Sequence, residues 1–334
     1  MKSYFKVTEQ QETDEKYMRR CLQLAQRGRV GAAPNPMVGA VVVCDGRIIG
    51  EGYHRRCGEA HAEVNAIANV REPKLLQHST LYVSLEPCAH YGKTPPCAQL
   101  IIDKHIPTVV VGCRDPFAQV DGRGIEMLER AGVEVREGVL EQECLWLNRC
   151  FITFHTHHRP YITLKWAQSK DGYIDHLRHD DQTPPAKFST PMTQMLVHKM
   201  RAENQAILVG RRTWELDHPS LTVRHWAGSD PLPIVLSRQS ILIGAETIAP
   251  QGNTLSVLLD ELYQRGIQSL LVEGGTRTLQ SFIDAGLWDE MRVEISPTEL
   301  GYGVAAPALP CKKVKSEDIE GNCLNYFIKN IKTG

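Results

Sequence analysis

One set of metal-binding residue types constrains this chain more than any other feature. His61 is followed by Ala62 and Glu63, and further along eight residues separate Cys88 from Cys97. One imidazole and two thiolates can hold a zinc ion and leave its fourth tetrahedral position open for water, as a catalytic zinc requires. The fold must therefore bring three separate segments to one point. Glu63 stays free of the metal and can carry protons.

The chemistry of such a site is specific. Water on zinc ionises near neutral pH, and a nearby carboxylate can carry its proton to a departing amine. Zinc nucleobase deaminases have an H-x-E and P-C-x-x-C pattern, which this chain matches with a longer cysteine spacing. The residues therefore predict hydrolytic deamination, with His61, Cys88 and Cys97 as zinc ligands and Glu63 as the catalytic acid–base group. The alternative is a closed structural zinc site completed by Cys57 or His90.

Local patterns place these residues at the ends of secondary-structure elements. Residues 37–43 and 47–53 predict a hairpin around Asp45 and Gly46, and residues 79–85 predict a strand that ends just before Cys88. Apolar residues at helical spacing follow His61, and two prolines precede Cys97, which predicts two helix starts. We expect both helix starts and the strand end to converge on one ion.

The chain is long enough for two domains. A chain of 334 residues is longer than one hydrophobic core usually supports. The polar segment 155–160 predicts a linker between two domains. We therefore expect a zinc-dependent deaminase domain over residues 1–157 and a second domain over residues 158–334. The second half predicts a mostly parallel sheet with strands near 161–165, 206–210, 233–237 and 269–272 and helices near 191–203, 257–265 and 276–285.

Charge and cysteine content limit the partners. The formal net charge is −1, and no run of Lys or Arg forms a nucleic-acid or membrane footprint. The ten cysteines lack a disulfide framework, and the opening residues lack the apolar segment of a secretory signal. We expect a cytoplasmic protein that acts on a small metabolite, with no nucleic-acid or membrane partner.

A glycine turn in the second half is a candidate phosphate site. Residues 271–279 predict a strand, a turn at Gly274 and Gly275, and a helix whose first amides could cradle a phosphate. A tight strand-to-helix turn explains the same pattern. Gly301, Gly303 and Ala306 match G-x-G-x-x-A formally, but too little chain follows for a dinucleotide-binding unit.

Several motifs in the same order resemble the bifunctional pyrimidine deaminase/reductase family of riboflavin biosynthesis. The resemblance rests on segments 33–39, 61–63, 86–97, 165–172, 210–224 and 272–275. It implies an α/β protein with an N-terminal cytidine-deaminase-like three-layer α/β/α domain and a C-terminal dihydrofolate-reductase-like α/β domain. It also implies Zn²⁺ and NADPH as cofactors, phosphoribosylaminopyrimidine substrates and a homo-oligomer.

By the same resemblance, the first domain deaminates 2,5-diamino-6-(5-phosphoribosylamino)pyrimidin-4-one and the second reduces its ribosyl group to ribityl. Deaminase substrate contacts are expected at Asn35, His54, His90 and Lys93. Reductase cofactor contacts are expected at Ala167, Thr213, Asp217, Gly275, Thr276, Arg277, Thr278, Leu279, Gln280 and Ser281. Reductase substrate contacts are expected at Arg201, Leu221, Arg224 and Glu273.

The chain departs from the family pattern at the cofactor edge. Lys187, Phe188 and Ser189 stand where relatives have a Trp-Ile-Thr/Ser element. Two other functional classes also fit the zinc motif. They are a deaminase that acts on nucleic acid, which the near-neutral charge disfavours, and a zinc-stabilised binding module without activity.

Overall fold

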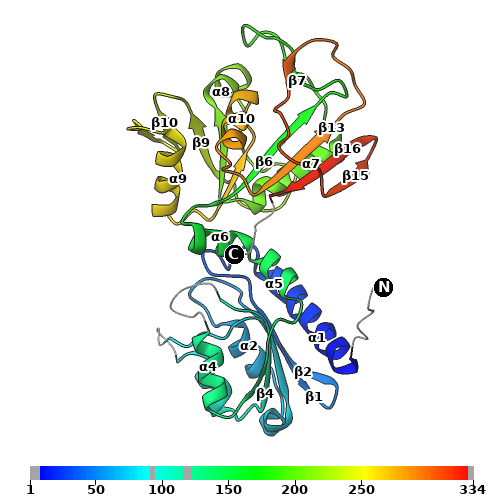
Figure 1. Ribbon diagram of the computed structural model, residues 1–334, viewed down its shortest axis with the longest axis vertical. Helices are drawn as coiled ribbons and strands as arrows, with labels where there is room; N and C mark the ends of the chain where they lie inside the picture. Colours follow the sequence, from blue (N-terminus) through cyan, green and yellow to red (C-terminus); the bar gives the residue numbers. More distant parts are fainter. Residues whose placement is uncertain (1–7, 91–94, 116–121, 330–334) are drawn as a thin grey trace, which may run out of the picture. The chain divides into compact units, whose positions relative to one another are not determined.

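The computed structural model describes residues 8–90, 95–115 and 122–329 (Figure 1). The chain divides into two compact units, Met1–His157 and His158–Gly334. Among the described residues, no helix combines the length and the apolar character needed to cross a bilayer.

Unit 1 contains a five-stranded sheet in the order β2-β1-β3-β4-β5. Its strands are β1 (Gly39–Cys44), β2 (Arg47–Tyr53), β3 (Thr80–Leu85), β4 (Thr108–Cys113) and β5 (Glu134–Arg136). Strand β1 runs antiparallel to β2 and β3, whereas β3, β4 and β5 are parallel. Its helices are α1 (Glu9–Ala25), α2 (Ala62–Ala68), α3 (Cys97–Asp103), α4 (Arg123–Arg130), α5 (Glu141–Leu147) and α6 (Arg149–His157).

Helices cover both faces of this sheet. Val42 faces α2, α3 and α4, whereas its neighbour Val41 faces α1 and α5. Successive strand residues point to opposite faces, so a strand that is apolar throughout needs a helical layer on each side. The predicted three-layer α/β/α arrangement is confirmed. Helix α2 lies close to β2 because Gly52 has no side chain, since a Cβ there would stand 2.3 Å from the Ala66 nitrogen.

The expected linker at residues 155–160 is wrong for its first three residues, although the two units divide within it, between His157 and His158. Helix α6 continues through His157. The ring of His155 packs 4.4 Å from that of Phe151, and the Thr156 hydroxyl donates to the Ile152 carbonyl. Side chains four residues apart lie together on a helix, so these contacts extend α6 into the polar segment as far as His157, and only residues 158–160 separate it from β6.

Unit 2 is built on a nine-stranded sheet in the order β11-β10-β9-β8-β12-β6-β13-β16-β15. These strands are β6 (Tyr161–Gln168), β8 (Ala206–Gly210), β9 (Leu232–Leu236), β10 (Ile241–Ile243), β11 (Glu246–Ile248), β12 (Ser269–Val272), β13 (Glu290–Ile295), β15 (Lys315–Ile319) and β16 (Asn322–Ile328). A two-stranded sheet pairs β7 (Tyr173–Asp175) with β14 (Val304–Ala305). The helices are α7 (Pro191–Glu203), α8 (Arg211–Asp217), α9 (Thr254–Gln264) and α10 (Thr276–Asp284).

The prediction of a mostly parallel sheet holds for its centre. Strands β9, β8, β12, β6 and β13 are parallel, whereas both edges are antiparallel. Short turns join β9 to β10, β10 to β11 and β15 to β16, and a parallel pairing would need a long crossover instead. Helices α9 and α10 pack on one face through Leu258 and Phe282, and α7 packs on the other through Met200. The parallel strands therefore end together beside α7, where a cavity opens.

Candidate active sites

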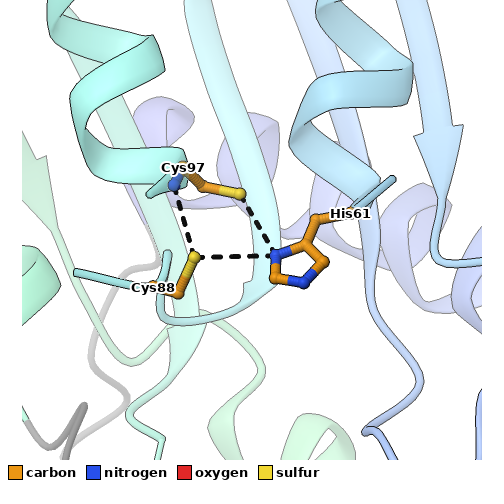
Figure 2. A group of neighbouring side chains, drawn as sticks. All are labelled: His61, Cys88 and Cys97. Atoms are coloured by element: carbon orange, nitrogen blue, oxygen red, sulfur yellow. Dashed lines mark hydrogen bonds between the residues drawn. The ribbon is translucent and has the colours of Figure 1, made fainter. Parts of the chain in front are cut away.

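The three predicted zinc ligands of unit 1 converge on one point (Figure 2). His61 is the N-cap of α2, Cys97 is the first residue of α3, and Cys88 follows β3. The Cys97 amide donates to the Cys88 Sγ at 3.3 Å, and the Ala98 amide donates to the Cys88 carbonyl at 3.2 Å. The start of α3 therefore fixes Cys88. In the described ranges, Cys57 and His90 lie outside the group of ligand atoms.

The spacing of the ligand atoms fits zinc. The His61 Nδ1 lies 3.3 Å from the Cys97 Sγ and 3.6 Å from the Cys88 Sγ. A tetrahedral ion with bonds of about 2.0 Å to nitrogen and 2.3 Å to sulfur would separate such atoms by about 3.5 Å. All three ligand atoms lie within 4.8 Å of one another. The donor set is therefore preformed for a small soft cation.

In the metal-free group, one thiolate and a protonated imidazole stabilise each other. Hydrogen bonds from Cys97 and His61 lower the pKa of Cys88 to about 4, against the effect of burial. The hydrogen bond with Cys88 raises the pKa of His61 to about 9. Cys88 is therefore a thiolate at neutral pH, whereas the hydrogen bond with Cys88 and burial raise the pKa of Cys97 well above its ordinary value. Zinc binds thiolates and neutral imidazole, so its binding would release protons from Cys97 and His61.

Glu63 lies in the first turn of α2 and is 3% exposed. Burial raises its pKa to about 7, although the nearby His61 opposes this shift. A carboxyl group with a pKa near the working pH can both accept and donate a proton.

Two predicted substrate contacts of unit 1 lie beside the metal ligands. The His54 ring packs edge-on against the His61 ring, with centroids 5.4 Å apart. The His54 Nδ1 donates to the Ala60 carbonyl at 3.2 Å, so its Nε2 accepts from the Asn35 amide at 3.1 Å. Burial lowers the pKa of His54, which favours this neutral form. His90 is exposed, and Lys93 lies outside the described residues.

Sequence reasoning missed the role of Glu86, although it quoted the Glu-Pro-Cys motif. The Glu86 carboxylate is 4% exposed and accepts from four backbone amides, those of Asp115, Gly122, Gly124 and Ile125. It thereby ties the start of α4 to the segment that carries Cys88. A Cβ on Gly124 would stand 1.9 Å from the Pro87 carbonyl oxygen, so only glycine permits this approach.

Unit 2 has a cavity of about 820 Å³ at the carboxyl ends of β8, β12 and β6. Parallel sheets bind ligands at this edge, and the volume lies in the range of small-molecule and cofactor sites. Seven predicted cofactor residues line it, namely Ala167, Thr213, Asp217, Gly275, Thr276, Arg277 and Thr278. Among these seven, Arg277 is exposed.

The starts of α8 and α10 meet at this cavity. The Gly275 amide donates to the Thr213 Oγ1 at 3.1 Å, and a Cβ on Gly210 would stand 2.3 Å from the Thr278 Oγ1. Glycine at both turns lets the two backbones approach. This arrangement and the basic residues nearby fit a phosphate-bearing cofactor.

Four predicted residues of unit 2 lie outside the cavity wall. Leu221 and Leu279 are buried in hydrophobic clusters, and the Leu279 amide is bonded to the Gly275 carbonyl. Gln280 binds the Ala308 amide, and the Ser281 hydroxyl donates to the Thr278 carbonyl. The expected cofactor turn at 275–281 therefore reaches the cavity only through its first four residues.

Arg201 and Glu273 form one unit in the cavity wall. Arg201 donates to the two Glu273 carboxylate oxygens at 3.1 and 2.7 Å, and both side chains are 12% exposed. A third Arg201 bond reaches the Thr222 carbonyl at 3.1 Å. Burial alone would raise the pKa of Glu273, but the hydrogen bonds and charge of Arg201 hold it below its usual range. Arg224 also lines the cavity, and its side chain is exposed.

A second buried arginine was not predicted. Arg178 is 5% exposed and pairs with both Asp175 and Asp217. Asp217 is thus bound to a cation before any ligand arrives. Lys187 lines the cavity and is exposed.

Comparison with known proteins identifies both units. A family model described as the RibD C-terminal domain matches residues 160–320. Another, described as the cytidine and deoxycytidylate deaminase zinc-binding region, matches residues 11–113. The riboflavin biosynthesis protein RibD of Aquifex aeolicus is 38% identical, over 95% of this chain and 99% of its own. RibD of Escherichia coli K12 is 36% identical, over 86% of this chain and 89% of its own.

Solved structures are similar over most of the chain. A diaminohydroxyphosphoribosylaminopyrimidine deaminase/5-amino-6-(5-phosphoribosylamino)uracil reductase from Thermotoga maritima is 36% identical, with a TM-score of 0.84 over 95% of this chain and 99% of its own. RibD of Acinetobacter baumannii gives the same TM-score at 29% identity, over 96% of this chain and 99% of its own. This chain therefore belongs to the RibD family of riboflavin biosynthesis, whose members join a zinc-dependent deaminase to an NADPH-dependent reductase.

Proposed function

We propose that unit 1 deaminates 2,5-diamino-6-(5-phosphoribosylamino)pyrimidin-4-one and that unit 2 then reduces the ribosyl group of the product to ribityl. The observation that carries this proposal is the joint presence of the His61, Cys88 and Cys97 group and the basic cavity of unit 2 in one chain. The relative from Thermotoga maritima, which is named for both activities, supports it over nearly its whole length.

In the deaminase step, His61, Cys88 and Cys97 hold the zinc ion. When bound, zinc supplies a Lewis acid that makes water a nucleophile near neutral pH. Glu63 takes a proton from the attacking water and gives it to the departing nitrogen, so that ammonia leaves and a carbonyl remains. Asn35 contacts the pyrimidine and His54 holds Asn35 in place beside the metal group, because the two ring nitrogens of His54 already bond Ala60 and Asn35.

In the reductase step, NADPH would supply one hydride to the ribosyl carbon that bears the amine, the bond from that carbon to the ring oxygen breaks, and one proton goes to that oxygen to give the open ribityl chain. Gly275, Thr276 and Thr278 hold the cofactor phosphates at the start of α10, and Ala167, Thr213 and Asp217 line the rest of its site. Arg224 contacts the substrate phosphate. Arg201 donates three hydrogen bonds, out of its five N–H groups, to Glu273 and Thr222. Its main role is therefore to orient Glu273 toward the substrate.

The test follows ammonia release and NADPH oxidation separately after the diaminopyrimidine phosphate is added to the full chain. Glu63→Gln is expected to keep stoichiometric zinc and to lose ammonia release by at least about 100-fold, a usual contribution of an acid–base group. It should oxidise NADPH normally when given the deaminated intermediate. The matched control is Glu72→Gln, which changes an exposed carboxylate near α2. Zinc loss or near-normal deamination in Glu63→Gln would contradict the role of Glu63.

We also propose a homo-oligomer in the cytoplasm with no nucleic-acid partner. Family resemblance supports the homo-oligomer, and the balanced charge supports the absence of a nucleic-acid partner. Light scattering and an RNA-binding titration at low salt test these two points.

A further inference from the structure

Glu294 is a buried carboxylate on β13 that the reductase chemistry above does not use. Glu294 is 3% exposed. The Oε1 atom accepts from the Asn322 Nδ2 at 2.6 Å, and the Oε2 atom accepts from the Ser189 hydroxyl at 2.7 Å. Within the described part of the chain no cation pairs with Glu294, so its charge depends on these two hydrogen bonds.

The donors and acceptors in this cluster have only one consistent arrangement. Asn322 is 2% exposed, and its amide nitrogen donates both hydrogens, one to the Phe188 carbonyl at 2.8 Å and one to Glu294. Both partners are acceptors, which fixes the orientation of the Asn322 amide. A carboxylate can only accept, so Ser189 must donate its single hydroxyl hydrogen to Glu294. The Ser189 oxygen is left with lone pairs alone.

Ser189 lines the cavity of unit 2. Glu294 on β13 pairs in register with Ala167 on β6, and residues paired in this way point to the same face of the sheet. Ala167 lines the cavity as well. Ser189 therefore lies above the sheet beside Ala167, on the β13 side. The helix start that suits the cofactor phosphates follows β12, on the other side of β6.

We propose that Ser189 accepts a hydrogen bond from the carboxamide N–H of the nicotinamide ring, and that Glu294 and Asn322 hold Ser189 as an acceptor. The placement rests on the proposed cofactor site. In this arrangement the phosphates lie at the start of α10 and the nicotinamide end, where the hydride is held, lies at Ala167 and β13. A primary amide supplies the donor that an acceptor-only oxygen requires. Glu294 and Asn322 are thus positioning residues that set the polarity of the contact.

The experiment compares NADPH with the reduced 3-acetylpyridine analogue, in which a methyl group replaces the amide nitrogen. Dissociation constants are measured on the full chain by fluorescence titration. Wild type is expected to bind NADPH about 3- to 10-fold more tightly than the analogue, the range of one hydrogen bond. Ser189→Ala should bind NADPH more weakly by the same factor and the analogue unchanged, so that the preference disappears.

Glu294→Gln tests the positioning role. Its Oε1 must face the Asn322 amide, so its Nε2 donates to Ser189 and turns the hydroxyl hydrogen toward the cavity. The preference for NADPH should again disappear, because NADPH and the acetylpyridine analogue both have a carbonyl that can accept the hydrogen bond from Ser189. Ser189→Thr keeps the hydroxyl and should keep the preference. Ser316→Ala, an exposed serine on β15 outside the cavity wall, is the matched control and should also keep it.

An equal loss of affinity for both ligands in Ser189→Ala would mean that Ser189 contacts another part of the cofactor and would overturn the proposal. An unchanged preference in Ser189→Ala or Glu294→Gln would overturn it as well. Ammonia release by unit 1 and the urea midpoint of each variant check folding. A wild-type chain that binds neither ligand would refute the reductase function itself, which is a distinguishable result.

Discussion

Replacement of Arg201 by methionine should destabilise unit 2 in a pH-dependent way. Methionine keeps most of the apolar stem and removes the guanidinium, so the Glu273 carboxylate loses its two charge-assisted bonds while it stays 12% exposed. Removing one partner of a buried ion pair costs about 3–5 kcal/mol. For a unit of this size, about 2–4 °C per kcal/mol gives a melting temperature about 6–20 °C lower.

The pH dependence follows from the pKa of Glu273. In the wild type this pKa lies below its ordinary value of 4.5, so the pair stabilises the fold above that pH and the contribution is lost as pH falls through the folded pKa. Without Arg201, burial is the dominant influence and raises the pKa of Glu273. The variant therefore regains stability as acid protonates Glu273. The difference between wild type and variant should be largest near pH 7.5 and should shrink toward pH 5.

Urea unfolding of the full chain, followed by tryptophan fluorescence at both pH values, measures this effect. Glu273→Gln in the Arg201→Met background removes the unpaired charge and should recover most of the lost stability. Arg211→Met is the matched control, because Arg211 pairs with Glu215 on the exposed surface of α8. Exposed pairs contribute only about 0–1 kcal/mol. A loss below about 1 kcal/mol in Arg201→Met, or an equal loss at both pH values, would refute the reasoning.

Three further outcomes are expected. Cys88→Ser should lose zinc by elemental analysis and still oxidise NADPH with the deaminated intermediate, because the metal site and the cavity belong to different units; loss of both activities in a folded variant argues against this separation. Gly124→Ala forces the Pro87 carbonyl aside and should weaken zinc affinity about 10- to 100-fold in chelator competition, the usual effect of changes around the ligands. Unaltered affinity would show that the backbone absorbs the methyl group. Asp217→Ala leaves Arg178 with Asp175 as its carboxylate partner and should raise the KM for NADPH more than the KM for substrate; equal rises would indicate a general loss of structure.

The sequence by itself predicted the features that depend on local pattern. The limits of β2, α7, β8 and β12 match the predicted ranges to the residue, because apolar periodicity and turn residues act over a few positions. The convergence of His61, Cys88 and Cys97 was also predictable. Only certain residue types bind zinc, and each of these follows a strand end or begins a helix, where its direction is already set.

The tertiary structure decided which distant side chains meet. Nothing in the local pattern shows that Arg201 is committed to Glu273, which is 72 positions away, or that Arg178 lies buried between two aspartates. The same holds for Glu294, whose partners Ser189 and Asn322 come from opposite ends of unit 2. These contacts arise where separate strands and loops pack on one face of the sheet. The polar groups of the cavity wall therefore depend on the assembled fold. Each buried charge pairs with a residue of whichever segment packs beside it.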